Sequence, residues 1–307
     1  LQPVLRKQRS TIKNNLYLGL FNLVFVGGTM LIFSLISDKG NWFDRSGKLY
    51  VMVFGVIPVL NGLYELYYLR RINESNYYKE SLEIKFDFWI KQKRVISIFI
   101  ITGILVLITL FQFITGLRDS VELAGLVKPT TLEGEYWRLL TCTLLHGSVM
   151  HILFNATAIF VIGRMVIRTT GFSYFTIVFL FSGILGSIFS LILMPNETSV
   201  GASGGIMGLI GFILIISIKL KDTMPRNIVK SMLATIILVT ITGISAIDII
   251  DNAAHAGGLI GGLIVGLIMI RRRKNMIPYK PTLLVNILGI TSTLILIGGI
   301  VMILKQL

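Results

Sequence analysis

The chain of 307 residues is 54% hydrophobic and only 14% charged, with a mean hydropathy of +0.80. This composition excludes a soluble domain, which needs more charge on its surface, and indicates a polytopic membrane protein. The net charge of +14 does not indicate a nucleic-acid partner, because the basic residues lie between apolar runs, where they act as topology signals. The single cysteine, Cys142, excludes an intrachain disulfide and a multi-cysteine metal site.

Apolar runs of about 20 residues, the length that crosses a hydrocarbon core of about 30 Å, recur along the whole chain. We expect nine membrane spans, at roughly 15–36, 50–69, 95–115, 147–167, 173–194, 203–220, 230–247, 252–270 and 283–304. The second span is the weakest because Pro58, Asn61 and Glu65 interrupt it, and an interfacial or re-entrant segment is the alternative there. The first run is too long for a cleavable signal peptide and lacks a small-residue cleavage site, so none is expected.

The basic residues predict how these spans are oriented. With nine spans, 22 of the 29 Lys and Arg residues fall on the same side as the N-terminus. Basic loops stay in the cytoplasm, so the N-terminus is expected inside and the C-terminus outside. Removing the second span would move every later loop to the opposite side and spoil this bias. The use of Lys, Ile and Asn fits a bacterial plasma membrane.

The chain divides into three expected parts. Residues 1–94 form a two-span module that ends in a charged, aromatic-rich linker, which is either an amphipathic helix on the inner leaflet or a solvated connector. Residues 95–270 form a six-span unit with one long outer segment, 116–146. Residues 271–307 hold a basic cytoplasmic loop and a nearly featureless final span.

The run Gly201-Ala202-Ser203-Gly204-Gly205 opens the sixth span and is a candidate for nucleophilic chemistry. A serine attacks only when a base takes its proton and donors stabilise the oxyanion, and the start of a helix offers free N–H groups for that purpose. The alternative is a packing face, because Gly204 and Gly208 have the spacing of close helix contacts.

His255 lies one turn into the eighth span, at the same expected outer depth as Ser203. Ionisable residues in membrane helices are functional candidates. Gly258 and Gly262 repeat at four-residue spacing along the same span, so this face is expected to meet the glycine face of the sixth span closely. The pattern predicts a Ser203–His255 dyad built on two glycine faces.

Further polar residues near the same depth have supporting roles. His151 and Asn155 are four residues apart, hence on one helix face, and we expect them to donate to an oxyanion. A metal site is the alternative, but His146 is the only histidine besides His151 and His255, and no His-Glu-x-x-His motif is present. His146 is expected to structure the outer loop. Asp251, one turn before His255, could form a triad with His255 and Ser203, but its position favours the role of N-cap of the eighth span.

These segments together resemble the rhomboid family of intramembrane serine proteases, over roughly residues 95–270. The resemblance rests on Trp137-Arg138, His146, His151-Ile-Leu-Phe-Asn155, Gly201-Ala-Ser203-Gly204, and Ala254-His255 followed by Gly258 and Gly262. It implies an all-α polytopic membrane protein: a six-helix rhomboid core with two extra N-terminal and one extra C-terminal transmembrane helices.

The resemblance also implies the roles of the residues. Ser203 would be the nucleophile and His255 the general base, while His151, Asn155 and the backbone N–H of Ser203 would stabilise the oxyanion. Many members carry an aromatic residue four positions after the serine, where this chain has Met207, whose thioether can also contact an imidazole. Such enzymes cleave transmembrane protein substrates near their outer ends, within the lipid bilayer and without metal or cofactor.

Two other classes of function compete with this interpretation. A catalytically silent relative that binds transmembrane helices as a chaperone is expected to have lost its nucleophile or base, and this chain has lost neither. A transporter or channel predicts charged residues at mid-membrane, and apart from Glu65 the spans offer almost none.

Overall fold

The described part of the protein is entirely helical apart from turns and one isolated β-bridge. The computed structural model describes residues 95–245, 250–271 and 278–307, together with the single positions Val59, Leu63, Tyr67 and Phe86. The predicted spans at 15–36 and 50–69 and the linker that follows them therefore lie outside the described residues. The chain divides into two compact units, Leu1–Phe88 and Trp89–Leu307, and the helices α6 to α16 all belong to the second.

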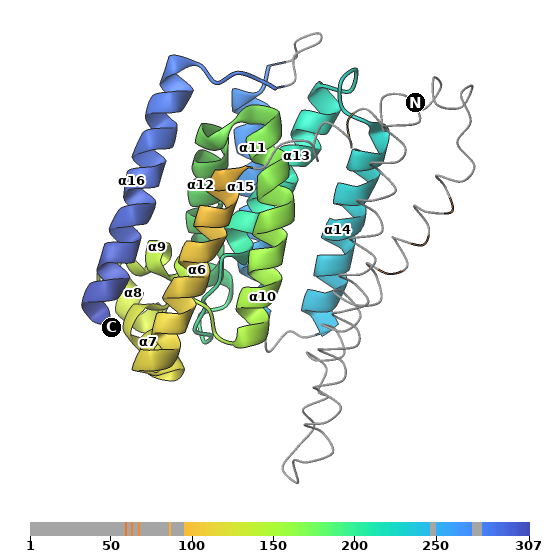
Figure 1. Ribbon diagram of the computed structural model, residues 1–307. Helices are drawn as coiled ribbons and strands as arrows, with labels where there is room; N and C mark the ends of the chain where they lie inside the picture. The colour runs from red at the N-terminus through yellow and green to blue at the C-terminus, as the bar shows by residue number, and fades with distance from the viewer. Residues whose placement is uncertain are drawn as a thin grey trace. The chain divides into compact units, whose positions relative to one another are not determined.

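Seven apolar helices form a bundle in the second unit (Figure 1). They are α6 (Ile96–Thr115), the continuous segment Val149–Thr170, α12 (Phe172–Leu193), α13 (Ser203–Lys219), α14 (Arg226–Ser245), α15 (Asn252–Met269) and α16 (Leu283–Gln306). Six of them are long and apolar enough to cross a membrane, whereas α13 is shorter, with 17 residues. All seven predicted runs after residue 94 are thus confirmed as helices. The total of nine spans stays a prediction.

The segment Val149–Thr170 is not a uniform helix. It consists of α10 (Val149–Ala158), a π-helical turn labelled η3 (Ile159–Gly163), and α11 (Arg164–Thr170). A Cβ at Gly163 would lie 2.8 Å from side-chain carbons of both Ile98 and Phe175. A larger residue would therefore push α6 and α12 away from the π turn.

Short helices fill the long loop between α6 and α10. They are α7 (Leu117–Ala124), α8 (Lys128–Leu132), α9 (Arg138–Thr141) and the 3-10 turn η2 (Cys142–Leu144). Figure 1 shows them at the end of the bundle where α16 finishes, and Gly299 of α16 lies against Leu140. The loop 116–146 and the C-terminal end of α16 thus occupy the same end of the bundle.

The extra C-terminal helix α16 packs mainly against α12. The hydroxyl of Ser173 donates to the side-chain oxygen of Asn286 at 2.8 Å, and that of Thr176 donates to the carbonyl of Gly289 at 3.1 Å. These two bonds make α16 a structural part of the described bundle.

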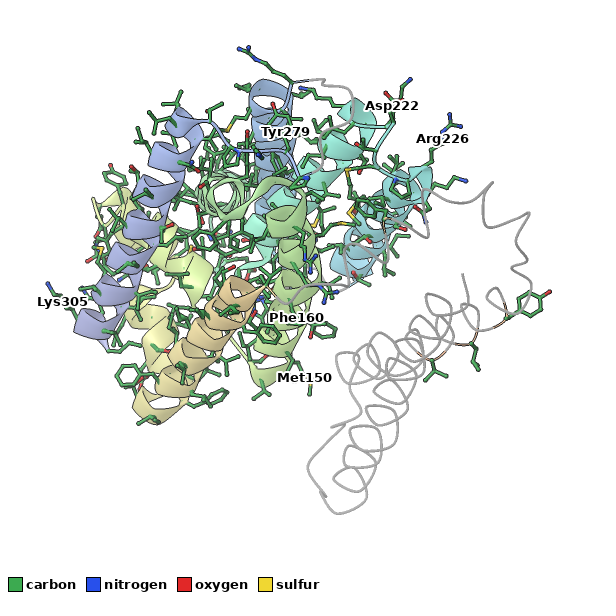
Figure 2. The ribbon with its side chains drawn as sticks, turned by 45° about the horizontal axis from the view of Figure 1, so that its top comes forward. Met150, Phe160, Asp222, Arg226, Tyr279 and Lys305 are labelled. Atoms are coloured by element: carbon green, nitrogen blue, oxygen red, sulfur yellow. The ribbon has the colours of Figure 1, made fainter. Side chains whose placement is uncertain are left out.

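Charged side chains at helix ends, such as Arg226 on α14 and Lys305 on α16, point away from the bundle (Figure 2).

Helices α13 and α15 touch through their backbones. A Cβ at Gly258 would lie 2.0 Å from the carbonyl oxygen of Gly204, and one at Gly262 would lie 1.8 Å from that of Gly208. Real Cβ atoms do not approach other atoms so closely, so only glycine permits this contact. The two glycine faces that the sequence predicts to meet are in backbone contact, and the first turn of α13 is held against the first turns of α15.

We expect Gly262→Ala to destabilise the protein by roughly 1–3 kcal/mol, because the new methyl group must force two backbones apart. This loss should exceed the gain of up to about 1 kcal/mol that Ala brings to a helix. Gly298→Ala on α16 is the matched control, because a Cβ there meets nothing within 4 Å. The measurement is thermal unfolding of both variants in detergent micelles. Equal midpoints for the two variants would contradict the backbone contact.

Candidate active site

Gly201 lies two residues before α13 and against the polar face of α10. Its φ of +132° belongs to a region that favours glycine. A Cβ there would lie 2.6 Å from Nε2 of His151 and 3.6 Å from Nδ2 of Asn155. The N–H of Gly201 donates to the carbonyl of Cys142 at 2.8 Å. The structure thus places His151 and Asn155 against the loop that leads into Ser203.

Ser203 is the first residue of α13. Its N-cap, Ala202, offers no side-chain hydrogen bond to the first turn. The first N–H groups of a helix have no intrahelical acceptor and carry the positive end of the helix dipole. The half-buried Ser203 hydroxyl therefore stands beside donors that suit a negatively charged oxygen.

His255 is fixed by the cap of its own helix. Asp251 is the N-cap of α15: its Oδ1 accepts from the N–H of Ala254 at 2.8 Å, and its carbonyl accepts from the N–H of His255 at 3.1 Å. The predicted cap is confirmed. The Nδ1 atom of His255 is buried and has no hydrogen-bond partner among the described residues. The Asp251 carboxylate therefore holds the helix and not this nitrogen, which favours a dyad over a triad.

Three histidines gather at this end of the bundle. The rings of His146 and His151 are nearly perpendicular, with centroids 5.3 Å apart, and His151 is close enough to His255 for electrostatic interaction. Asn155 is buried, and its Nδ2 has no partner within the described ranges. The structure places His151 and Asn155 of α10 against Gly201 and brings His255 of α15 near His151, and the chemical roles of these residues stay predictions.

His146 joins the end of the loop 116–146 to α6. Its N–H donates to the side-chain oxygen of Gln112 at 3.0 Å, and the side-chain nitrogen of Gln112 donates to the His146 carbonyl at 3.2 Å. The Thr109 hydroxyl, which also contacts the carbonyl of Leu105, lies 3.2 Å from Nδ1 of His146. Contacts from two residues of α6 therefore hold His146.

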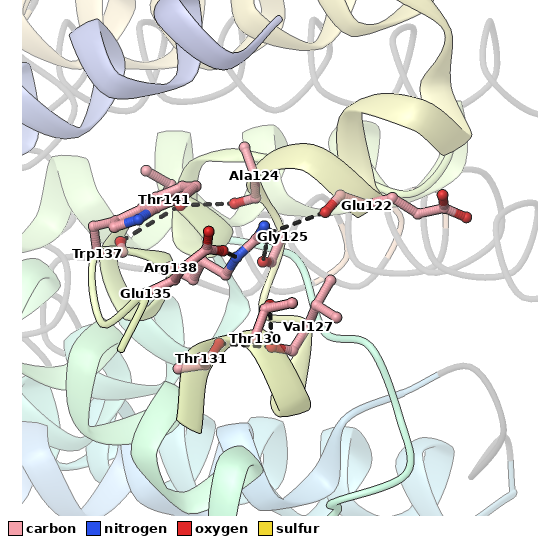
Figure 3. Close-up of polar contacts among 10 residues, drawn as sticks. All are labelled: Glu122, Ala124, Gly125, Val127, Thr130, Thr131, Glu135, Trp137, Arg138 and Thr141. Atoms are coloured by element: carbon pink, nitrogen blue, oxygen red, sulfur yellow. Dashed lines mark hydrogen bonds and ion pairs between the residues drawn. The ribbon is translucent and has the colours of Figure 1, made fainter. Parts of the chain in front are cut away.

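Arg138 organises the loop from within (Figure 3). Its Nη1 donates to the carbonyls of Glu122 and Gly125 at 3.0 and 2.9 Å, and its Nε pairs with the Glu135 carboxylate at 2.5 Å. The guanidinium also lies 4.8 Å from the ring centroid of Trp137. The buried Arg138 side chain thus ties together the backbone of the loop through two carbonyls and one carboxylate.

Two polar residues of this region, Gln112 and Lys128, are not marked by any of the sequence motifs. Gln112 is an amide inside an apolar span, and this alone was a signal for a structural or functional role. Lys128, by contrast, is one of many loop lysines in the sequence, yet it is buried in the structure. Met207 is buried one turn after Ser203 on α13, and its contact with the imidazole of His255 stays a prediction.

A protein family and individual known proteins match this chain. The Rhomboid domain family matches residues 133–272. The chain is 32% identical over 146 residues to "Putative rhomboid protease YdcA" of Bacillus subtilis (strain 168), covering 46% of this chain and 71% of that protein. The chain therefore belongs to the rhomboid family.

Other relatives are longer than the part they share with this chain. "Rhomboid protease GluP" of Bacillus subtilis (strain 168) is 39% identical over 130 residues, which cover 42% of this chain and 25% of that protein. "RHOMBOID-like protein 4" of Arabidopsis thaliana is 32% identical over 186 residues, which cover 57% of this chain and 47% of that protein. The chain thus spans half or less of the length of these two relatives.

Burial lowers the pKa of His146 from 6.5 to about 3, and a charge on the nearby His151 adds to this effect. At a pH between these two pKa values, the imidazole of His146 is protonated in the unfolded chain but not in the folded protein. The stability that neutral His146 provides is complete above pH 6.5 and is lost as the pH falls toward 3. We expect His146→Gln to flatten the dependence of stability on pH in this window, measured by thermal unfolding in micelles. An unchanged slope would show that other groups cause it.

Proposed function

We propose that this member of the rhomboid family is an intramembrane serine endopeptidase with Ser203 as nucleophile and His255 as general base. One observation carries the proposal: α13 and α15 are in backbone contact at the turns that begin with Ser203 and hold His255. The same end of the bundle places His151 and Asn155 against Gly201, two residues before the serine. The relative named as a rhomboid protease in Bacillus subtilis supports this assignment.

The proposed reaction runs in two steps. In the first, His255 takes the proton of the Ser203 hydroxyl while the oxygen attacks the substrate carbonyl, and the same proton then passes to the leaving amine. In the second, a water gives a proton to His255 and its oxygen attacks the ester carbonyl; the bond to Oγ of Ser203 then breaks, His255 returns the proton to Oγ, and the carboxylic acid is released. Both steps form an oxyanion that needs donors.

Donors for that oxyanion come from two elements. The backbone N–H of Ser203 is one of the free groups at the start of α13. The Nδ2 atom of Asn155 is buried and unpaired within the described part of the chain, so it can donate without first breaking a bond. Donors already in place act strongly because the site need not reorganise when charge develops. His151 is a second side-chain donor on the same helix face.

The proposed substrates are transmembrane segments of other proteins. A peptide bond within a helix is hydrogen-bonded and shielded, so the segment must unwind near the cut, which favours small or helix-breaking residues there. We propose that it enters the bundle sideways at α14. Among the described spanning helices, α14 has the smallest share of buried residues, 17%. It packs mainly on α13 (Figure 1).

The distribution of basic residues supports a proposed orientation. With two N-terminal spans before α6, the Ser203 end of the bundle faces the outside of the cell, with the N-terminus in the cytoplasm. Cleavage would then occur near the outer end of the substrate segment, where water reaches the polar residues of the site.

We expect Ser203→Ala to abolish cleavage of a model transmembrane substrate in proteoliposomes, and His255→Ala to lower it on the order of 10⁴-fold or more, because the two residues act as a unit. Ser217→Ala is the control. It removes a buried hydroxyl from the other end of the same helix, where the Ser217 side chain donates to the backbone carbonyl of Ile213. Cleavage by Ser203→Ala at the rate of the unsubstituted protein would refute the assignment.

Labelling with a fluorophosphonate, which reacts with activated serines, separates the two remaining functions. A protease should be labelled at Ser203 and should lose the label in Ser203→Ala. A folded, unlabelled protein would favour the non-catalytic role of binding transmembrane helices.

A further inference from the structure

Lys128 is a buried cation in the loop 116–146. Its side chain is 2% exposed, and its Nζ donates to the hydroxyl of Ser190 in the last turn of α12 at 2.7 Å. Burial lowers the pKa of Lys128, and the negative charge of Asp251 opposes that effect. A buried ammonium group is stable only when it is paired and hydrogen-bonded, so the identity of its counter-charge matters.

Asp251 supplies that counter-charge through the same serine. The hydroxyls of Ser190 and Ser199 both donate to Oδ2 of Asp251, the latter at 2.5 Å. Because Ser190 gives its proton to the carboxylate, it accepts from Lys128 with a lone pair. The bonds therefore run in one direction, from ammonium through hydroxyl to carboxylate, and charge at both ends strengthens them.

Two members of this network, Asp251 and Ser199, lie on the segments that carry His255 and Ser203. Asp251 is the N-cap of the helix that carries His255. Ser199 lies four residues before Ser203, and its backbone pairs with that of Leu126, two residues before Lys128, through N–H to carbonyl bonds of 2.9 and 3.3 Å. The segment before Ser203, helix α15 and the loop 116–146 thus meet at one hydrogen-bonded network that joins the Lys128 ammonium to the Asp251 carboxylate.

We propose that Lys128 is a positioning residue, which sets the start of α15 relative to the Ser203 segment through Ser190, Asp251 and Ser199. The inference rests on the proposed protease function. It assigns to the loop 116–146 a part in aligning the dyad, in addition to covering that end of the bundle. Lys128 itself touches neither Ser203 nor the substrate in this role.

Positioning and simple anchoring predict different results. If Lys128 only anchors the loop, its loss lowers stability, and the molecules that remain folded react with a probe at the normal rate. If Lys128 aligns the dyad, the folded molecules themselves react more slowly. A displacement of about 1 Å in a catalytic site costs roughly 10²-fold in rate.

The experiment uses the full chain in detergent micelles and measures the rate at which a fluorophosphonate labels Ser203, below the unfolding midpoint of each variant. We expect Lys128→Met to slow labelling about 10- to 100-fold. With a transmembrane substrate it should lower kcat by a similar factor and leave KM nearly unchanged. Lys128→Arg should restore much of the rate because it keeps the charge. The control is Thr131→Val on the same short helix, which removes a buried hydroxyl that donates to the carbonyl of Val127 one turn earlier.

A second variant covers the case in which Lys128→Met does not fold. Asp251→Asn keeps an oxygen for the cap but removes the carboxylate charge, so it should also slow labelling. If the two residues act together, Lys128→Met should have a smaller effect in the Asp251→Asn background than alone. Normal labelling of either folded single variant would overturn the inference and leave the protease function standing. Absence of labelling in the unsubstituted protein would overturn both.

Discussion

The contact between the backbones of α13 and α15 is the constraint on which the candidate site depends. Within a bilayer, helices gain little from hydrophobic burial against one another, so small residues that permit close approach decide where helices pack. Here Gly204 and Gly208 lie directly against Gly258 and Gly262. This contact fixes the separation of the two helix starts, and the serine and the histidine are carried on those starts.

The polar end of the bundle adds a second level of order. Three residues join elements that are far apart in the sequence. Gly201 lies close to His151, Asp251 accepts hydrogen bonds from Ser190 and Ser199, and His146 forms two hydrogen bonds with the side-chain amide of Gln112. Buried polar groups need hydrogen-bond partners, so each hydrogen bond between two elements opposes their sliding past one another. The backbone contact therefore sets the distance between helices, and the polar bonds set their register.

The sequence predicted the parts of this structure that follow from local pattern. Apolar runs of spanning length located seven helices, glycines at four-residue spacing marked the contact face, and Asp251 before an apolar run marked a cap. It did not predict the π turn at Ile159–Gly163 or the burial of Lys128. Both depend on neighbours from other helices, which no window of sequence contains. The N-terminal spans and the roles of the site residues lie beyond what the described part of the chain tests.

The region matched by the rhomboid family is shorter than the unit that folds around it. Residues 133–272 exclude α6, whose Gln112 and Thr109 hold His146, and α16, whose Gly299 lies against Leu140. A fragment cut to the matched region would lose both supports of the loop and expose the apolar face of α12. A recombinant form that keeps both supports must therefore include α6 and α16, well past the boundaries of the family match.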